Sequence, residues 1–239
     1  MEFSDVKYSQ YLQILREELL PAMGCTEPIA MAYAAARARQ TLGKMPDKID
    51  IVISGNIIKN VKSVVVPNTG GLKGIAAAVA AGAVVGDADR QLEVLSYVKP
   101  EEIPKIAEFM DKCQMTVIKS DSGKLLDIDL HMYSGTDSVR LRICDNHTNI
   151  VLIEKNGEVL FKKDSDDGES GETDRSVLNV RDILDFAQSV RLEDVSDMLG
   201  RQIEYNLAIS EEGLRGNYGA SIGKTLLETR GNDVRVRAR

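Results

Sequence analysis

One cysteine of the chain stands where a helix is expected to begin. Cys25 lies within residues 23–30, and Thr26 and Pro28 suit a helix N-cap and a first helical turn. Backbone N–H groups and the helix dipole favour negative charge there, so we expect a lowered pKa for the Cys25 thiol. The thiolate is a candidate nucleophile, base or metal ligand. A small buried apolar residue is an equally good interpretation, because free cysteines are often buried.

A glycine-rich turn offers a second candidate site. Residues 67–74 read Pro-Asn-Thr-Gly-Gly-Leu-Lys-Gly and precede an alanine-rich helical pattern. Free N–H groups at such a turn and helix start can hold a carboxylate or a phosphate. The alternative is that the glycines only permit a tight turn and close helix packing. The candidate substrate-binding residues are Asn68, Thr69, Gly70, Gly71 and Lys73.

Acid–base candidates are few. Glu27 could act as a general base beside Cys25, although a carboxylate in a first helical turn is common for dipole reasons alone. The remaining thiols and imidazoles are expected to be incidental or solvent-exposed, namely Cys113, Cys144, His131 and His147. We therefore expect neither a Ser/His/Asp nor a Cys/His catalytic arrangement.

Two further motifs fail on spacing. The acidic run at residues 164–174 resembles a calcium loop, but Gly168 and Arg175 stand where ligands are required, which favours a mobile loop. Residues 219–225 resemble a phosphate-binding loop, but Tyr218 stands where its first glycine is required. The sequence therefore predicts neither a calcium site nor a nucleotide site of this kind.

Hydrophobic periodicity indicates the elements that position these residues. Helices are predicted at residues 9–23, 26–42, from 75 onward, 90–98, 101–112, 180–190 and 192–209. Strands are predicted at residues 49–53, 61–66, 115–118, 126–132, 139–143, 150–154 and 159–162. The Asn156-Gly157 pair between the last two strands is a strong hairpin signal.

This order of elements predicts an α+β fold. We expect an alanine-rich helical layer with a short sheet, and an inserted antiparallel-sheet subdomain with helices on one face. Residues 1–86 form a helix-rich segment that carries both candidate sites, and residues 87–175 form the α+β insertion that ends in the acidic loop. Residues 176–239 form a helical segment that returns to the first and reads as truncated.

Composition limits the class of partner. The 239 residues are 43% hydrophobic and carry a formal net charge of −7, so we expect no general affinity for nucleic acid or for an acidic membrane. Three widely spaced cysteines argue against a disulfide framework and favour a reducing compartment. We expect a cytoplasmic protein, and the alanine-rich helices leave a homodimer open.

The motif at residues 24–28, Gly-Cys-Thr-Glu-Pro, followed by residues 67–74, resembles the start of a known family. This is the iron–sulfur L-cysteine desulfidase and L-serine dehydratase alpha-chain-like family. The resemblance covers essentially the whole chain, which looks like the N-terminal half of a family member. It implies a lyase that eliminates sulfide from L-cysteine, or water from L-serine, to give pyruvate and ammonia. It also implies a [4Fe–4S] cluster, with Cys25 as a metal ligand or as the base that takes the α-proton.

The same resemblance implies that something is missing. The other cluster cysteines of the family belong to its second half, and Cys113 and Cys144 do not fall in matching motifs. We therefore expect this chain alone to bind no cluster and to be inactive, with the missing C-terminal half as its partner. The alternative function is a non-catalytic binding or assembly module that holds a carboxylate or phosphate at residues 68–74. The sequence leaves cysteine and serine open as substrates.

Overall fold

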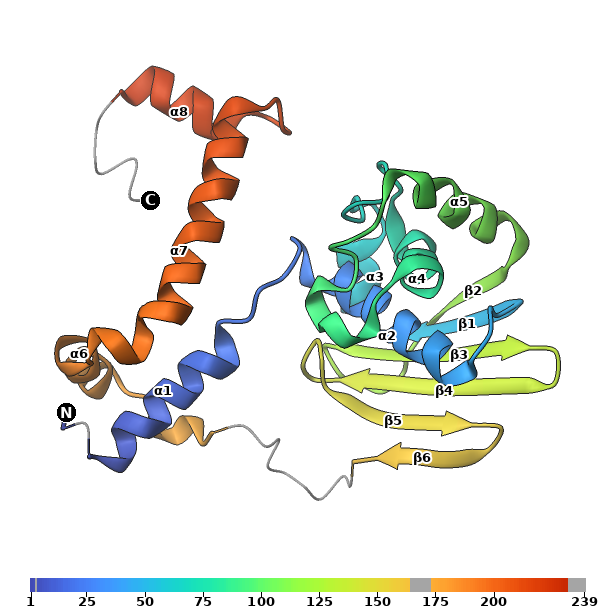
Figure 1. Cartoon of the computed structure of the whole chain (residues 1–239), viewed down its shortest axis with the longest axis horizontal. Coiled ribbons are helices and arrows are strands. Elements are labelled where there is room, and N and C mark those ends of the chain that lie inside the picture. Colours follow the sequence, from blue (N-terminus) through green and yellow to red (C-terminus); the bar gives the residue numbers. More distant parts are fainter. Residues whose placement is uncertain (3, 164–172, 232–239) are drawn as a thin grey trace. The chain divides into compact units, whose positions relative to one another are not determined.

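The structure is a computed structural model of the chain and describes residues 1–2, 4–163 and 173–231. The chain divides into two compact units (Figure 1). Unit 1 comprises Met1–Leu20 and Glu169–Arg239, and unit 2 comprises Pro21–Gly168. The segments drawn from the sequence, residues 1–86, 87–175 and 176–239, follow other boundaries.

Unit 2 is built on a six-stranded mixed sheet in the order β2-β1-β3-β4-β5-β6. Its strands are β1 (Lys48–Ile53), β2 (Gln114–Lys119), β3 (Asp127–Ser134), β4 (Asp137–Cys144), β5 (Ile150–Lys155) and β6 (Glu158–Lys162). β1 pairs parallel with β2 and antiparallel with β3, and the strands from β3 to β6 are antiparallel to their neighbours. Asn156 and Gly157, both at positive φ, form the predicted turn between β5 and β6. The α+β fold is thereby confirmed.

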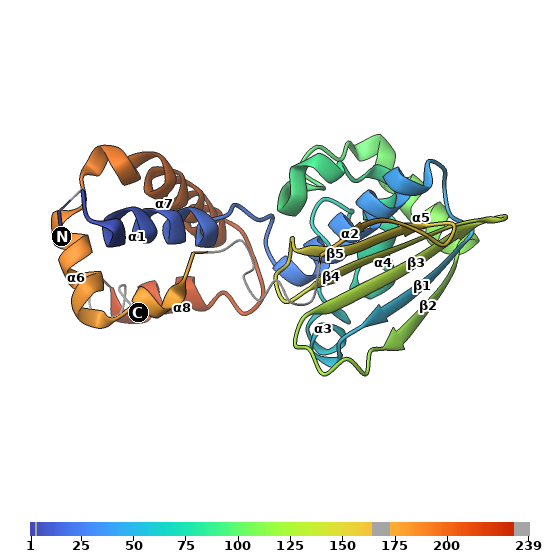
Figure 2. The ribbon, with the colours of Figure 1, turned by 90° about the horizontal axis from the view of Figure 1, so that it is seen from below.

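Helices of unit 2 pack on one face of this sheet (Figure 2). They are α2 (Thr26–Leu42), α3 (Gly55–Val61), α4 (Gly74–Val85) and α5 (Ile103–Lys112), with short 3-10 turns η1 (Ala88–Glu93) and η2 (Pro100–Glu102). Alternate residues of β1, such as Ile49 and Ile51, are fully buried beneath the helices. The helical face of the sheet therefore forms the core of the unit.

α2 and α4 lie in unusually close contact. A Cβ atom added at Gly82 of α4 would lie 2.0 Å from the carbonyl oxygen of Ala32 in α2. One at Gly86 would lie 2.8 Å from the Cβ of Ala36. The alanine-rich composition of both helices is thus explained by backbone-to-backbone packing in the core.

Two predicted elements of unit 2 are wrong. Residues 61–66 form no strand, since α3 ends at Val61 and only an isolated bridge joins Val65 to Lys73. Ile57 and Val61 of α3 are both fully buried, which is the i, i+4 spacing of a helix face. The predicted helix at residues 90–98 is replaced by η1, which Gln91 interrupts with φ 49°.

Unit 1 is helical and has a small core of its own. It contains α1 (Val6–Glu18), η3 (Arg175–Val177), α6 (Val180–Ser189), α7 (Leu192–Arg215) and α8 (Ile222–Arg230). α1 is capped by Asp5 and begins at Val6, earlier than the helix predicted from residue 9. The rings of Tyr8 and Tyr11 pack 5.5 and 5.1 Å from that of Phe186, so the first helix is held by residues more than 160 positions later.

Residues 164–172 of the predicted acidic loop and residues 232–239 at the end of the last segment lie outside the described residues. No helix in the described part of the chain combines the length and the apolar character needed to cross a bilayer.

Candidate thiol–carboxylate site

The thiol of Cys25 is exposed at the start of α2. Cys25 is the N-cap residue, a position expected for Thr26 from sequence, and its side chain makes no cap hydrogen bond to the backbone. The thiol instead donates to Glu27 Oε2, with an Sγ–Oε2 distance of 3.2 Å. Gly24, at φ 104°, supplies the turn that brings the chain into the helix. The two candidate acid–base residues therefore form a hydrogen-bonded pair.

The pKa of Cys25 differs from the sequence-based expectation. Partial burial and the hydrogen bond to Glu27 raise the pKa of the Cys25 thiol, and the negative charge of Glu27 acts in the same direction. A carboxylate within hydrogen-bonding distance outweighs the helix dipole, which contributes only partial charge. Cys25 is thus a protonated thiol that donates to a carboxylate.

Glu27 is held as that carboxylate by its other neighbours. Partial burial acts to raise the pKa of Glu27, but hydrogen bonds from Cys25, from its own backbone and from Asn60 lower it overall. Asn60 Nδ2 donates to Glu27 Oε1 at 3.0 Å, and Thr26 Oγ1 lies 3.4 Å from Oε2. Glu27 is therefore an ionised acceptor for the hydrogen bond of the thiol.

His147 also acts on this pair. It lies half-buried in the turn between β4 and β5, where burial lowers its pKa and the charge of Glu27 opposes that effect. The sequence predicts that His147 is incidental or solvent-exposed, and it does not indicate Asn60 as a site residue. The sequence predicts a strand at residues 61–66 and no helix before it, so it does not indicate the position of Asn60 on α3.

The glycine-rich turn is built by its own hydrogen bonds. The N–H of Val66 donates to Leu72 O, and the N–H of Gly74 donates to Val64 O. The side chain of Asn68 donates to Leu95 O, and the Thr69 hydroxyl is buried and donates to Val66 O. The side chains of Asn68 and Thr69 therefore stabilise the loop through these hydrogen bonds.

The backbone at the tip of this turn remains available. Gly70 and Gly71 have φ of 69° and 95°, and among the described residues neither N–H donates an intramolecular hydrogen bond. Lys73 is exposed and is the N-cap residue of α4. Binding at the turn would thus use backbone N–H groups and Lys73, and it stays a prediction.

The turn and the cysteine segment adjoin each other. A Cβ added at Gly24 would lie 3.9 Å from Pro67 Cγ. The segment at residues 95–96 contacts both, because Leu95 O accepts from Asn68 and the Ser96 hydroxyl lies 3.2 Å from the sulfur of Met23. The structure therefore brings together the two motifs that the sequence separates by about forty residues.

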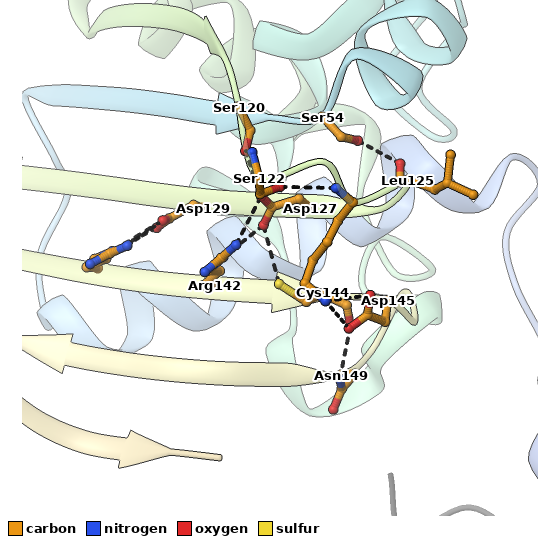
Figure 3. A network of polar contacts seen from close by, with 12 residues as sticks. Ser54, Ser120, Ser122, Leu125, Asp127, Asp129, Arg142, Cys144, Asp145 and Asn149 are labelled. Atoms are coloured by element: carbon orange, nitrogen blue, oxygen red, sulfur yellow. Dashed lines mark hydrogen bonds and ion pairs between the residues drawn. The ribbon is translucent and has the colours of Figure 1, made fainter. Parts of the chain in front are cut away.

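The other thiols belong to the interior. Cys113 and Cys144 are buried, and burial raises their pKa values to about 11 and about 12. Cys144 donates to Asp127, which also accepts from Arg142, Ser120 and Ser122 (Figure 3). This network ties the loop between β2 and β3 to the end of β4.

His131 alternates along β3 with the core residues Leu130 and Met132, so it lies on the face of the sheet away from the core. It is 3.3 Å from Asp129, which accepts hydrogen bonds from both Nε and Nη2 of Arg140. Its side chain is 29% exposed, so it is partly covered rather than fully solvated.

The described residues do not by themselves fit an iron–sulfur cluster. Cys25 is the exposed cysteine, and the other two thiols are buried in separate surroundings. Within the described ranges, no group of three or more His, Cys, Asp or Glu side chains is arranged to hold a metal ion. The [4Fe–4S] cluster stays a prediction, and we derive no step through it.

Comparison with known proteins gives relatives along the whole chain. The chain is 53% identical over 240 residues to the UPF0597 protein DSY1109 of Desulfitobacterium hafniense, covering 100% of this chain and 56% of the relative. It is 44% identical to a UPF0597 protein of Treponema denticola and 45% identical to one of Lachnoclostridium phytofermentans, over 99% and 97% of this chain. The chain also spans 56% of each of these two relatives. No protein-family model and no solved structure matches.

These relatives correct two expectations. The resemblance to the iron–sulfur L-cysteine desulfidase and L-serine dehydratase alpha-chain-like family is wrong as an assignment, because the matching proteins carry the UPF0597 name. The predicted partner, a missing C-terminal half of such a lyase, is also not supported, since UPF0597 proteins match this chain from end to end. What the chain is similar to, over its whole length, is the UPF0597 proteins.

Proposed function

We propose that this chain carries the proton-transfer and carboxylate-binding parts of a cytoplasmic lyase. Its substrate is a small amino acid, L-cysteine or L-serine, from which sulfide or water is eliminated to give pyruvate and ammonia. The observation that carries the proposal is the 3.2 Å contact between Cys25 Sγ and Glu27 Oε2 at an exposed helix start beside the glycine-rich turn. The chain spans 56% of its relatives, so the activity of the whole protein is part of the proposal.

The pair has the chemistry that an elimination requires from its base. When the thiol gives its proton to Glu27, the Cys25 sulfur can accept the α-proton of the substrate. The electrons of the broken Cα–H bond then form the Cα–Cβ double bond. The β-substituent leaves with the proton held by Glu27, as hydrogen sulfide or water, which restores the Glu27 carboxylate. The resulting enamine tautomerises to an imine, which water hydrolyses to pyruvate and ammonia.

The substrate carboxylate would be held at the turn. The N–H groups of Gly70 and Gly71 are available, and Lys73 adds a positive charge close by. Asn68 and Thr69 act indirectly by fixing the loop. The turn therefore supplies binding, and the Cys25–Glu27 pair supplies proton transfer.

Binding by this chain is the first test. Calorimetry with L-cysteine and L-serine is expected to show binding that a Lys73→Ala substitution weakens. Asn56→Ala is the matched control, because Asn56 is exposed on α3 and outside the site. Absence of binding by either amino acid would remove the carboxylate site.

Turnover is tested in a longer relative, the DSY1109 protein. Anaerobic treatment with iron and sulfide, followed by incubation with L-cysteine or L-serine, is expected to release pyruvate. No pyruvate from either amino acid refutes the lyase.

A non-catalytic carboxylate- or phosphate-binding module is the second candidate. The free N–H groups at the turn favour it, together with a cysteine that is protonated rather than a ready thiolate. Phosphate binding with no pyruvate release would favour this candidate, and Glu27→Gln would then leave binding unchanged.

A further inference from the structure

Asn60 lies where it can control Glu27. It is the penultimate residue of α3, and its side-chain nitrogen donates to Glu27 Oε1 at 3.0 Å. The other oxygen of the same carboxylate, Oε2, accepts from Cys25 at 3.2 Å and lies 3.4 Å from the Thr26 hydroxyl. The two oxygens of Glu27 therefore have separate partners.

The direction of the Asn60 amide follows from its partner. A carboxylate only accepts hydrogen bonds, so the NH₂ end of Asn60 must face Glu27. α3 packs against the core through Ile57 and Val61, which are fully buried. Asn60 thus presents its donor from a fixed position.

Glu27 needs such a contact. Glutamate has several side-chain torsions, and the last of them is broad. Glu27 is only half-buried, so core packing alone does not hold its carboxylate group. Asn60 donates to Oε1, the oxygen that does not face Cys25. It fixes the rotation that points Oε2 at the sulfur.

We propose that Asn60 is a positioning residue that holds Glu27 in the orientation needed to accept the hydrogen bond of the Cys25 thiol. A thiol, a carboxylate and an orienting amide are thereby joined by two consecutive hydrogen bonds. The assignment of a catalytic purpose rests on the proposed function, whereas the hydrogen-bond chain does not. His147, from the turn between β4 and β5, is the other titratable group that acts on Glu27.

The test measures the thiol hydrogen bond directly. The S–H stretching band in the infrared moves to lower wavenumber when the thiol donates to an acceptor. Cys25→Ser identifies the band of Cys25 against those of Cys113 and Cys144, the two buried thiols. In the folded protein at neutral pH, Asn60→Ala is expected to move the Cys25 band to higher wavenumber, as Glu27→Gln also does.

The combination of the two changes separates positioning from a general structural effect. If Asn60 acts through Glu27, then Asn60→Ala adds no shift in the Glu27→Gln background. Asn60→Leu, which is similar in size but has no donor, gives the same result and guards against a cavity effect. Asn56→Ala, on the exposed side of α3, is expected to leave the band unchanged.

Two results would overturn the proposal. One is a Cys25 band that does not move in either Asn60 variant, and the other is an equal shift with and without Glu27. Absence of pyruvate release in the turnover assay refutes the lyase but leaves these spectra as expected. The two proposals therefore fail separately.

Discussion

Replacing Asp127 with asparagine tests the buried ion pair that joins the β2–β3 loop to β4. Asp127 is 1% exposed and accepts hydrogen bonds from Arg142, Ser120, Ser122 and Cys144. Asparagine keeps the shape but removes the charge, and its NH₂ group would face donors. The neutral side chain therefore loses the ion pair and leaves part of the network unsatisfied.

The size of the effect follows from the pKa of Asp127. Burial acts to raise that pKa, but hydrogen bonds from Arg142 and the two serines hold it at about 2, against an ordinary 3.8. A shift of this size corresponds to about 2 kcal/mol of stability at neutral pH. Because the folded-state pKa is depressed, this stabilisation is present above pH 3.8 and is lost as pH falls through about 2.

Breaking a buried pair costs ~3–5 kcal/mol when the other charge stays buried. The side chain of Arg142 is 29% exposed and can reach water, which favours the lower end. We expect Asp127→Asn to lower the free energy of unfolding by about 2–3 kcal/mol at pH 7. The difference from the wild type should shrink as pH falls below 3.8.

Urea denaturation followed by circular dichroism, at pH 7 and in steps towards pH 2.5, measures both quantities. Pulse alkylation at pH 7 assigns the transition to unit 2, because buried Cys144 becomes reactive when the sheet unfolds. Asp121→Asn is the control, since Asp121 is exposed in the same loop. A loss below about 0.5 kcal/mol at pH 7, or one that is equal at both ends of the pH range, would refute the reasoning.

Two further predictions concern Cys25 and the helix pair. Because the pKa of its thiol is raised, Cys25 should react with iodoacetamide more slowly at pH 8 than an ordinary thiol, and Glu27→Gln should speed the reaction. Mass spectrometry of the alkylated protein measures the rate. An unchanged rate in Glu27→Gln would contradict the prediction. Gly82→Ala should destabilise the chain by about 1–3 kcal/mol, because the new Cβ meets the backbone of Ala32. In the control Gly200→Ala the new Cβ meets no other atom, so this variant should be neutral or stabilising. Thermal unfolding compares the two variants, and equal melting temperatures would count against the close contact between α2 and α4.

Several helices and strands could be predicted from local sequence patterns. The helix at residues 26–42 and the hairpin at Asn156 and Gly157 agree with the structure, because capping residues and turn chemistry act over a few positions. The strand predicted at residues 61–66 is wrong because the prediction used local pattern alone, and consecutive valines favour a strand wherever they occur. That run connects α3 to the glycine-rich turn, a placement that only tertiary packing decides.

The candidate site could be predicted from the sequence only in part. The position of Cys25 at a helix start follows from its neighbours in sequence, but its pKa depends on the side-chain conformation of Glu27. Asn60 is 33 residues from Glu27, and His147 lies in the turn between β4 and β5. No local pattern indicates that these residues converge on one carboxylate.

The close contact between α2 and α4 also governs distance within the candidate site. α2 begins just after Cys25, and α4 begins just after the glycine-rich turn. With the carbonyl oxygen of Ala32 occupying the space where a side chain of residue 82 would project, neither helix can slide or rotate without displacing the other. The separation between the sulfur and the turn is consequently set by the interior of the protein, so substitutions deep in the core should change the geometry of the candidate site.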